Sequence, residues 1–128
     1  MPLTAYALYV ILKVLWKITE TSTFREWFAE LDVDALADIV EAAQVLKSYG
    51  PQLGRPHVDT VYESRHSNMK ELRVQSTGRP FRIFFAFDPT RQAVFLIGGN
   101  KKGDKRFYKR MIAKSDDLYD EYLEDKNG

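Results

Sequence analysis

The sequence contains no cysteine among its 128 residues. This absence excludes a disulfide framework, a thiolate metal site, an iron–sulfur cluster and a cysteine nucleophile. With only 7 glycines and 5 prolines, the chain is neither collagen-like nor of low complexity. Its two histidines, His57 and His66, lack the spacing of a metal site, and there is no serine elbow. We therefore predict no metal and no cofactor, and interpret both histidines as structural or adjacent to substrate.

A long hydrophobic run is also missing. The most apolar stretch, Leu3–Leu15, contains Lys13 and is shorter than the roughly 20 residues of a membrane span. It lacks the leading positive charges and the small-residue cleavage site of a signal peptide. We expect no membrane association, and a cytoplasmic location fits the absence of cysteine. Residues 1–15 are predicted to form an apolar extension. It is either a strand or short helix that leads into a first strand near Val14–Ile18, or a segment that packs on a partner.

The remaining composition indicates one globular domain spanning residues 1–128. Hydrophobic residues make up 45% of the chain and aromatic residues 13%, enough to form a core. The net charge of +1 conceals an uneven distribution. Residues 1–64 and 111–128 each carry a net −4, whereas residues 65–110 carry +9. A basic central segment is expected either to meet phosphates or to form a solvated face balanced by acidic helices.

Two helices are predicted in the N-terminal half. Thr23 and Glu26 form a capping box before an apolar stripe over residues 24–31. Asp34 can cap a second helix, which Gly50 ends together with the proline after it. The apolar face of this second helix consists of Leu36, Ile39, Val40, Ala43 and Leu46.

A third helix is predicted from about Asp104 to Leu123, where aromatic and aliphatic residues recur at helical spacing. Its acidic end, Asp116–Asp125, opposes the helix dipole. We expect this end to fray or to meet a basic partner.

Three strands are predicted between the second and third helices, over Tyr62–Gln75, Phe81–Asp88 and Ala93–Asn100. Turn-like residues separate them, which indicates a meander. The order β-α-α-β-β-β-α predicts an α+β fold, with a small sheet, helices on one face and the other face partly open.

Charged side chains gather on that open face. Strand alternation places Glu71 and Arg73 on the same side, and Arg82 can join them from the next strand. The following segment adds Lys101, Lys102, Lys105, Arg106 and Tyr108. Each member also has a purely structural explanation, as a cross-strand ion pair, a solvated turn or a core aromatic. Their convergence on one face favours a site.

An ordered set of motifs gives a more specific indication. In sequence order they are Trp27–Leu31, Gly50-Pro51, Lys70-Glu71-Leu72-Arg73, Phe81-Arg82-Ile83-Phe84-Phe85 and Gly98-Gly99-Asn100-Lys101-Lys102. Over residues 16–123 the chain resembles the RelE/HigB superfamily of bacterial toxins, and most of all its phage-derived HigB-like branch. The resemblance implies a small mixed sheet with two N-terminal helices and one C-terminal helix. It also implies a ribosome-dependent mRNA endonuclease and an antitoxin with a helix-turn-helix domain encoded beside it. Operator DNA would be contacted only through this antitoxin.

The same resemblance implies roles for individual residues. Glu71 lies where relatives have a general base, and Arg73 and Arg82 lie where they have phosphate-binding cations. Lys102 and Tyr108 correspond to an arginine and a late tyrosine, either of which could act as the general acid. The neighbouring cations assigned to RNA contact are Lys70, Arg79, Lys101, Lys105 and Arg106.

Two other functions stay open at this point. A ParE-like toxin would inhibit DNA gyrase without cutting RNA, and a phage-derived nucleic-acid-binding module would have no activity. The presence of Glu71 beside two arginines favours the nuclease, because a gyrase inhibitor needs no group that transfers a proton.

Overall fold

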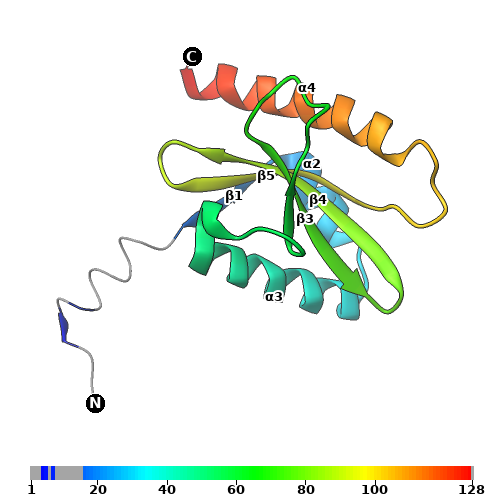
Figure 1. Cartoon of the computed structure of the whole chain (residues 1–128), viewed down its shortest axis with the longest axis horizontal. Helices are drawn as coiled ribbons and strands as arrows, with labels where there is room; N and C mark the ends of the chain where they lie inside the picture. The colour runs from blue at the N-terminus through cyan, green and yellow to red at the C-terminus, as the bar shows by residue number, and fades with distance from the viewer. Residues whose placement is uncertain (1–3, 6, 8–15, 128) are drawn as a thin grey trace.

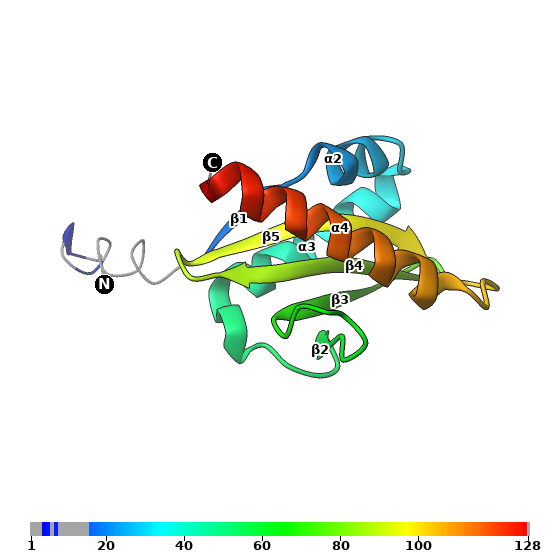
Figure 2. The same ribbon diagram turned by 90° about the horizontal axis from the view of Figure 1, so that it is seen from above.

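A five-stranded sheet with helices on both of its faces forms the body of the computed structural model (Figures 1 and 2). The structure describes residues 4, 5, 7 and 16–127. The predicted α+β class is confirmed. In chain order the elements are β1 (Lys17–Glu20), α2 (Ser22–Ala29), α3 (Val33–Tyr49), the 3-10 turn η1 (Gly50–Gln52), β2 (Val58–Thr60), β3 (Met69–Ser76), β4 (Arg79–Asp88), β5 (Gln92–Asn100) and α4 (Phe107–Asn127).

The strands lie in the order β1-β5-β4-β3-β2. β1 runs parallel to β5 and every other pair is antiparallel. The predicted meander of three strands is confirmed as β3, β4 and β5. The prediction near Val14–Ile18 overlaps β1 at its last two residues, whereas Val14, Leu15 and most of the apolar extension lie outside the described residues.

The first strand of the meander begins later than predicted. Residues 62–68 form turns, and a short strand that the sequence analysis missed, β2, precedes them. The prediction of one strand from Tyr62 was therefore wrong. Ser64, Ser67 and Asn68 explain the difference, because their short polar side chains favour turns over a strand.

The helices cover both faces of the sheet, not one face as predicted. Helices α2 and α3 pack against the side of β4 that carries Ile83 and Phe85. Helix α4 packs against the other side, which carries Phe84 and Ala86. Figure 1 shows α3 below the sheet and α4 above it. Both sides of β4 are apolar, so each needs a cover that excludes water. Only a corner of the second face is left for polar side chains.

The helix starts also differ from the prediction. Thr21, rather than Thr23, caps α2, and its hydroxyl accepts a hydrogen bond from the Phe24 amide at 3.0 Å. Asp32, rather than Asp34, precedes α3 and makes no capping bond with its side chain. The face that α3 buries consists of Ala35, Ile39 and Leu46. Val40, predicted on that face, is exposed.

The acidic end of α4 is held within the molecule. Asp88, which is 2% exposed, accepts hydrogen bonds from Tyr122 at 2.6 Å and from Lys126 at 2.5 Å. Burial alone would raise the pKa of Asp88, but these bonds outweigh it and hold that pKa far below its usual range. Although α4 has 21 residues, no helix in the described part of the chain is apolar enough over a sufficient length to cross a bilayer.

The two glycines at the end of β5 let helices approach the sheet from both sides. A Cβ atom at Gly98 would overlap the ring of Trp27 on α2. A Cβ atom at Gly99 would lie 2.9 Å from Cε1 of Phe107, at the start of α4. Gly98 therefore allows the close approach of α2, and Gly99 that of the α4 N-terminus.

We predict that Gly98→Ala lowers the free energy of unfolding by about 1–3 kcal/mol, because the added methyl group overpacks the contact with Trp27. The matched control is Gly54→Ala, where nothing lies within 4 Å of the added atom. Both substitutions lower the conformational entropy of the unfolded chain by the same amount, so this effect cancels in the comparison. Urea denaturation measures the difference, and equal midpoints for the two variants would contradict the prediction.

Candidate functional site

Four of the residues singled out from the sequence meet at the uncovered corner of the sheet. The register places Arg73 of β3 opposite Arg82 of β4, and Glu71 lies two residues before Arg73 on the same face. Oε1 of Glu71 lies 3.3 Å from Nε of Arg73 and 3.8 Å from Nε of Arg82. The hydroxyl of Tyr108, in the first turn of α4, donates a hydrogen bond to the same oxygen at 3.2 Å.

Glu71 is almost fully buried, with 5% of its surface exposed. Its second carboxylate oxygen, Oε2, is also buried and has no hydrogen-bond partner among the described residues. One oxygen of Glu71 is thus occupied by the cluster, whereas the other keeps free lone pairs. A carboxylate in this state can accept a proton from a hydroxyl group placed beside it.

Tyr108 is held in one orientation, because its hydroxyl accepts a hydrogen bond from Nε of Arg82 at 3.3 Å while donating to Glu71. Burial raises the pKa of the Tyr108 phenol above its usual value. The carboxylate of Glu71 adds to this rise and Arg82 opposes it. At neutral pH the phenol therefore retains its proton and can act as a donor.

The two arginines differ in exposure. The side chain of Arg82 is 9% exposed and donates to the Phe81 carbonyl at 3.0 Å, so it is part of the framework. The side chain of Arg73 is 34% exposed. Arg73 is therefore the guanidinium of the cluster that an incoming anion can reach.

A cavity of about 300 Å³ opens beside this cluster. Its lining includes Glu71, Arg73 and Tyr108 of the cluster. The remaining lining residues are Asp59, Thr60, Val61 and Glu63. None of these four residues was predicted to line the site. The turn that places Glu63 was missed because Tyr62–Gln75 was predicted as one strand. The turn-forming composition of residues 64–68 was the signal that could have revealed it.

Two predicted RNA contacts lie away from the cluster. Arg79 stacks over Phe81 and forms an ion pair with Asp32 at 2.8 Å, on the side of the sheet that faces α2 and α3. Lys70 lies on the same side by strand alternation and donates to the Thr60 hydroxyl at 2.8 Å. The structure brings neither residue together with Glu71.

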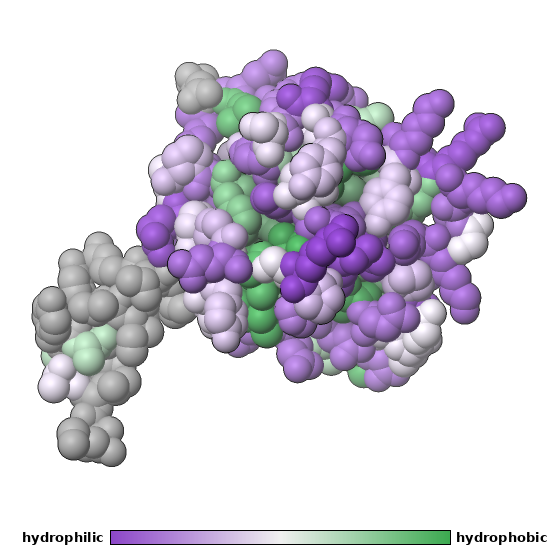
Figure 3. Space-filling model, in the orientation of Figure 1, coloured by the Kyte–Doolittle hydropathy of each residue, from purple (hydrophilic) through white to green (hydrophobic). Residues whose placement is uncertain are grey.

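The other predicted cations lie on the turn between β5 and α4. Nζ of Lys101 lies 5.6 Å from the centre of the Tyr108 ring. Lys101 is therefore in direct contact with the cluster. Lys102, Lys105 and Arg106 are exposed. Hydrophilic side chains project from this end of the molecule, at the right in Figures 1 and 3. The turn can therefore present several positive charges to a polyanion next to the cluster.

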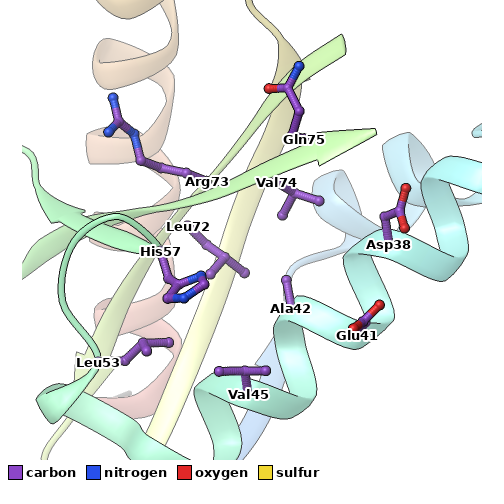
Figure 4. Close-up of a pocket in the computed structure, with 10 residues that line it drawn as sticks. All are labelled: Asp38, Glu41, Ala42, Val45, Leu53, His57, Leu72, Arg73, Val74 and Gln75. Carbon is purple, nitrogen blue, oxygen red and sulfur yellow. The ribbon is translucent and has the colours of Figure 1, made fainter. Parts of the chain in front are cut away.

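A second cavity, of about 210 Å³, lies on the other face of the sheet between α3 and β3 (Figure 4). Leu72 and Val74 point toward α3 in this view, whereas Arg73 points away. His57 lines this cavity and is not part of the Glu71 cluster. His66 lies 2.7 Å from Asp120 of α4, a contact that tethers the loop before β3.

Comparison with known proteins identifies relatives over most of the chain. Residues 26–120 match the family model described as "Phage derived protein Gp49-like (DUF891)". A Mycobacterium tuberculosis protein named HigB3, described as a candidate toxin, is 46% identical over 103 residues, which are 80% of this chain and 89% of HigB3. HigB2 of the same organism, similarly described, is 48% identical over 99 residues, 76% of this chain and 49% of that protein.

The fold is also similar to that of a solved structure. A chain in the crystal structure of the toxin–antitoxin complex RelBE2 from Mycobacterium tuberculosis superposes with a TM-score of 0.55 at 18% sequence identity. The match covers 68% of the present chain and 99% of that chain. The predicted RelE-like fold and the predicted membership of the HigB branch are both confirmed.

We predict that Glu71→Gln lowers the pKa of Tyr108 toward the ordinary tyrosine value, because it removes the negative charge that disfavours the phenolate. The pH dependence of the tyrosine ring ¹³C resonances measures the change. Glu26→Gln, an exposed position on α2, is the control and should leave the pKa of Tyr108 unchanged. An unchanged pKa in Glu71→Gln would mean that the two side chains do not interact in solution.

Proposed function

The chain belongs to the Gp49-like family of phage-derived proteins, and on this premise we propose that it is the toxin of a type II toxin–antitoxin module that cleaves mRNA on the ribosome. The observation that carries the proposal is the buried carboxylate of Glu71, which keeps one oxygen free beside a phenol and an accessible guanidinium. The HigB names of its relatives support the toxin assignment.

Cleavage of RNA through its own 2′-hydroxyl requires three functions. A base removes the hydroxyl proton, cations stabilise the charge that develops on the phosphoryl oxygens, and an acid protonates the leaving 5′-oxygen. In the proposed mechanism, Oε2 of Glu71 accepts the proton. Arg73 binds the phosphoryl oxygens, and Arg82 holds Glu71 and Tyr108 in place.

Tyr108 is the proposed general acid. Its raised pKa keeps the proton on the phenol, and the hydrogen bond from Arg82 stabilises the phenolate formed after transfer. Lys102 is the alternative acid and lies on the turn between β5 and α4. Loss of activity in Tyr108→Phe but not in Lys102→Ala would separate the two.

The partners follow from the same proposal. The likeness to a toxin chain of the RelBE2 complex supports an antitoxin as the neutralising partner. We propose that it carries a helix-turn-helix domain, and that operator DNA is contacted only through it. The ribosome and its mRNA would be the cytoplasmic targets, met first by the half-buried Lys101 and the exposed cations Lys102, Lys105 and Arg106.

We predict that expression of the chain without an antitoxin arrests growth and yields cut mRNA, and that Glu71→Gln removes cleavage but leaves ribosome binding intact. The substitution preserves the shape of the side chain and removes the proton acceptor. Primer extension on cellular mRNA and co-sedimentation with ribosomes measure the two effects.

Glu26→Gln is the control and should cleave like the parent. Cleavage by Glu71→Gln at the parental rate would reject Glu71 as the base. Growth arrest with intact mRNA would instead support gyrase inhibition, and normal growth with folded protein would support a binding module without activity.

We predict that Arg73→Ala slows cleavage by roughly ten- to a hundredfold, the value of one charged hydrogen bond of about 1.5–3 kcal/mol. Because Arg73 also pairs with the buried Glu71, thermal melting has to show that the variant is folded before the rates are compared. Arg25→Ala, an exposed guanidinium on α2, is the control. Equal rates for the two variants under single-turnover conditions would show that Arg73 does not contact the reacting phosphate.

A further inference from the structure

The outer surface of α3 carries a stripe of exposed residues. The stripe consists of Val33, Ala37, Val40, Gln44 and Lys47. Val33 is 78% exposed and Val40 is 47% exposed, although both are apolar. Alternating spacings of four and three residues place the five side chains on one face of the helix, which is the pattern of a helix that packs against another element.

An open hollow of about 560 Å³ lies beside this stripe, between α2 and α3. Its apolar lining comes from Phe28 of α2 and from Leu36, Ala37 and Val40 of α3. Apolar side chains that enter the hollow remove hydrocarbon surface from water on both sides of the contact. The hollow therefore favours an apolar occupant.

A row of carboxylates runs next to the stripe. It consists of Asp34, Asp38 and Glu41, and Figure 4 shows the last two on successive turns of α3. Among the described residues, these three side chains make no hydrogen bond and no ion pair. An occupant that carries a positive charge beside its apolar part would complement this row.

The N-terminal arm, defined here as residues 3–15, has both properties. Eleven of its thirteen residues are apolar, and the other two are Thr4 and Lys13. The arm precedes the match to the Gp49-like family, which begins at residue 26. It is therefore a feature of this chain outside the matched family region.

The arm joins the body of the molecule at the C-terminal end of α3. The Trp16 amide donates to the Lys47 carbonyl at 3.1 Å, and the Trp16 ring fills the space next to Gly50, where a Cβ atom would overlap it. Thirteen residues span about 20 Å as a helix and about 43 Å when extended, whereas the stripe from Val33 to Lys47 is about 21 Å long. The arm is therefore long enough to lie along the whole stripe.

The body of the same chain does not cover the described part of the arm. Thr4 and Ala5 are exposed, and the hydrogen bond made here is local, from the Ala7 amide to the Thr4 hydroxyl at 3.0 Å. These residues, drawn in dark blue, lie apart from the sheet and the helices in Figures 1 and 2. Two copies that exchange their arms bury both arms and both hollows in one closed pair.

We propose that the chain forms a symmetric dimer, in which the N-terminal arm of each copy lies in the hollow between α2 and α3 of the other. A two-fold axis perpendicular to α3 makes the two α3 helices antiparallel. Lys47 at the end of one α3 then comes opposite Asp34 at the start of the other, and Lys13 of the arm reaches the same row of carboxylates. The proposal does not depend on the nuclease activity.

Light scattering after size-exclusion chromatography tests the dimer with the full chain, and the expected mass is about twice 14.9 kDa. Val40→Asp and Ile11→Asp should each halve the mass, because each places a charge in the buried contact. The matched control is Tyr62→Asp, at an 83% exposed position on the loop between β2 and β3, and it should remain dimeric. Thermal melting shows whether each variant is folded.

The absence of cysteine allows a second measurement that needs no charged variant. Chains that carry Ile11→Cys are co-expressed with chains that carry Val40→Cys and are then oxidised. Mass spectrometry of the digested protein should find a disulfide between positions 11 and 40, which in this mixture can only join two copies. Ile11→Cys co-expressed with Tyr62→Cys is the control and should give no bridge between positions 11 and 62.

A monomeric parent chain overturns the proposal. A dimer that persists in both aspartate variants also overturns it, because the interface then lies elsewhere. Dissociation of only one of the two variants, or no bridge between positions 11 and 40, shows that the arm and the hollow do not meet. Cleavage of mRNA enters none of these measurements, so a failure of the proposed function is detected separately by primer extension.

Discussion

Burial of the Glu71 carboxylate is the constraint on which the geometry of the site depends. A charged carboxylate loses several kcal/mol of hydration inside a protein unless cations and hydrogen-bond donors replace water. Here the replacements come from three elements, with Arg73 on the same strand, Arg82 on the next strand and Tyr108 on α4. The strand register and the placement of α4 therefore both contribute partners to this one carboxylate, because Arg82 reaches it across the register and Tyr108 reaches it from α4.

The position of α4 is set at three points along its length. At its start, Phe107 packs against the backbone of Gly99, where no side chain intervenes. In the middle, carboxylates of the helix hold the loop before β3 through Arg65. At its end, Lys126 reaches the buried Asp88. Three of the acidic residues that oppose the helix dipole, Asp116, Asp117 and Asp120, are thus paired with Arg65, which offsets part of the unfavourable interaction with the dipole.

Features that depend on local periodicity were predicted correctly from the sequence. Features that depend on contacts between residues far apart in the chain were not. Alternation along β3 correctly placed Glu71 and Arg73 on one face. The covering of the second face by α4 was missed, because the apolar pattern of a helix does not say which surface it meets. The separation of Arg79 from the site was missed for a similar reason. Its ion pair with Asp32 joins residues far apart in the chain, a pairing that composition alone cannot reveal.

The unsatisfied atoms of the cluster indicate what the site is built to receive. Buried polar atoms in folded proteins nearly always have partners, and the exceptions concentrate where function requires them. Among the described residues, Oε2 of Glu71 and Nε of Arg73 are two of these exceptions. The first lacks a donor, and the second has Oε1 of Glu71 at 3.3 Å as an ion-pair partner but makes no hydrogen bond. RNA supplies both within one nucleotide, because its 2′-hydroxyl donates and the adjacent phosphate accepts, whereas DNA lacks the hydroxyl. Under the proposed function, an RNA strand would supply the missing partners, and tight binding would then be coupled to correct placement of the reacting groups.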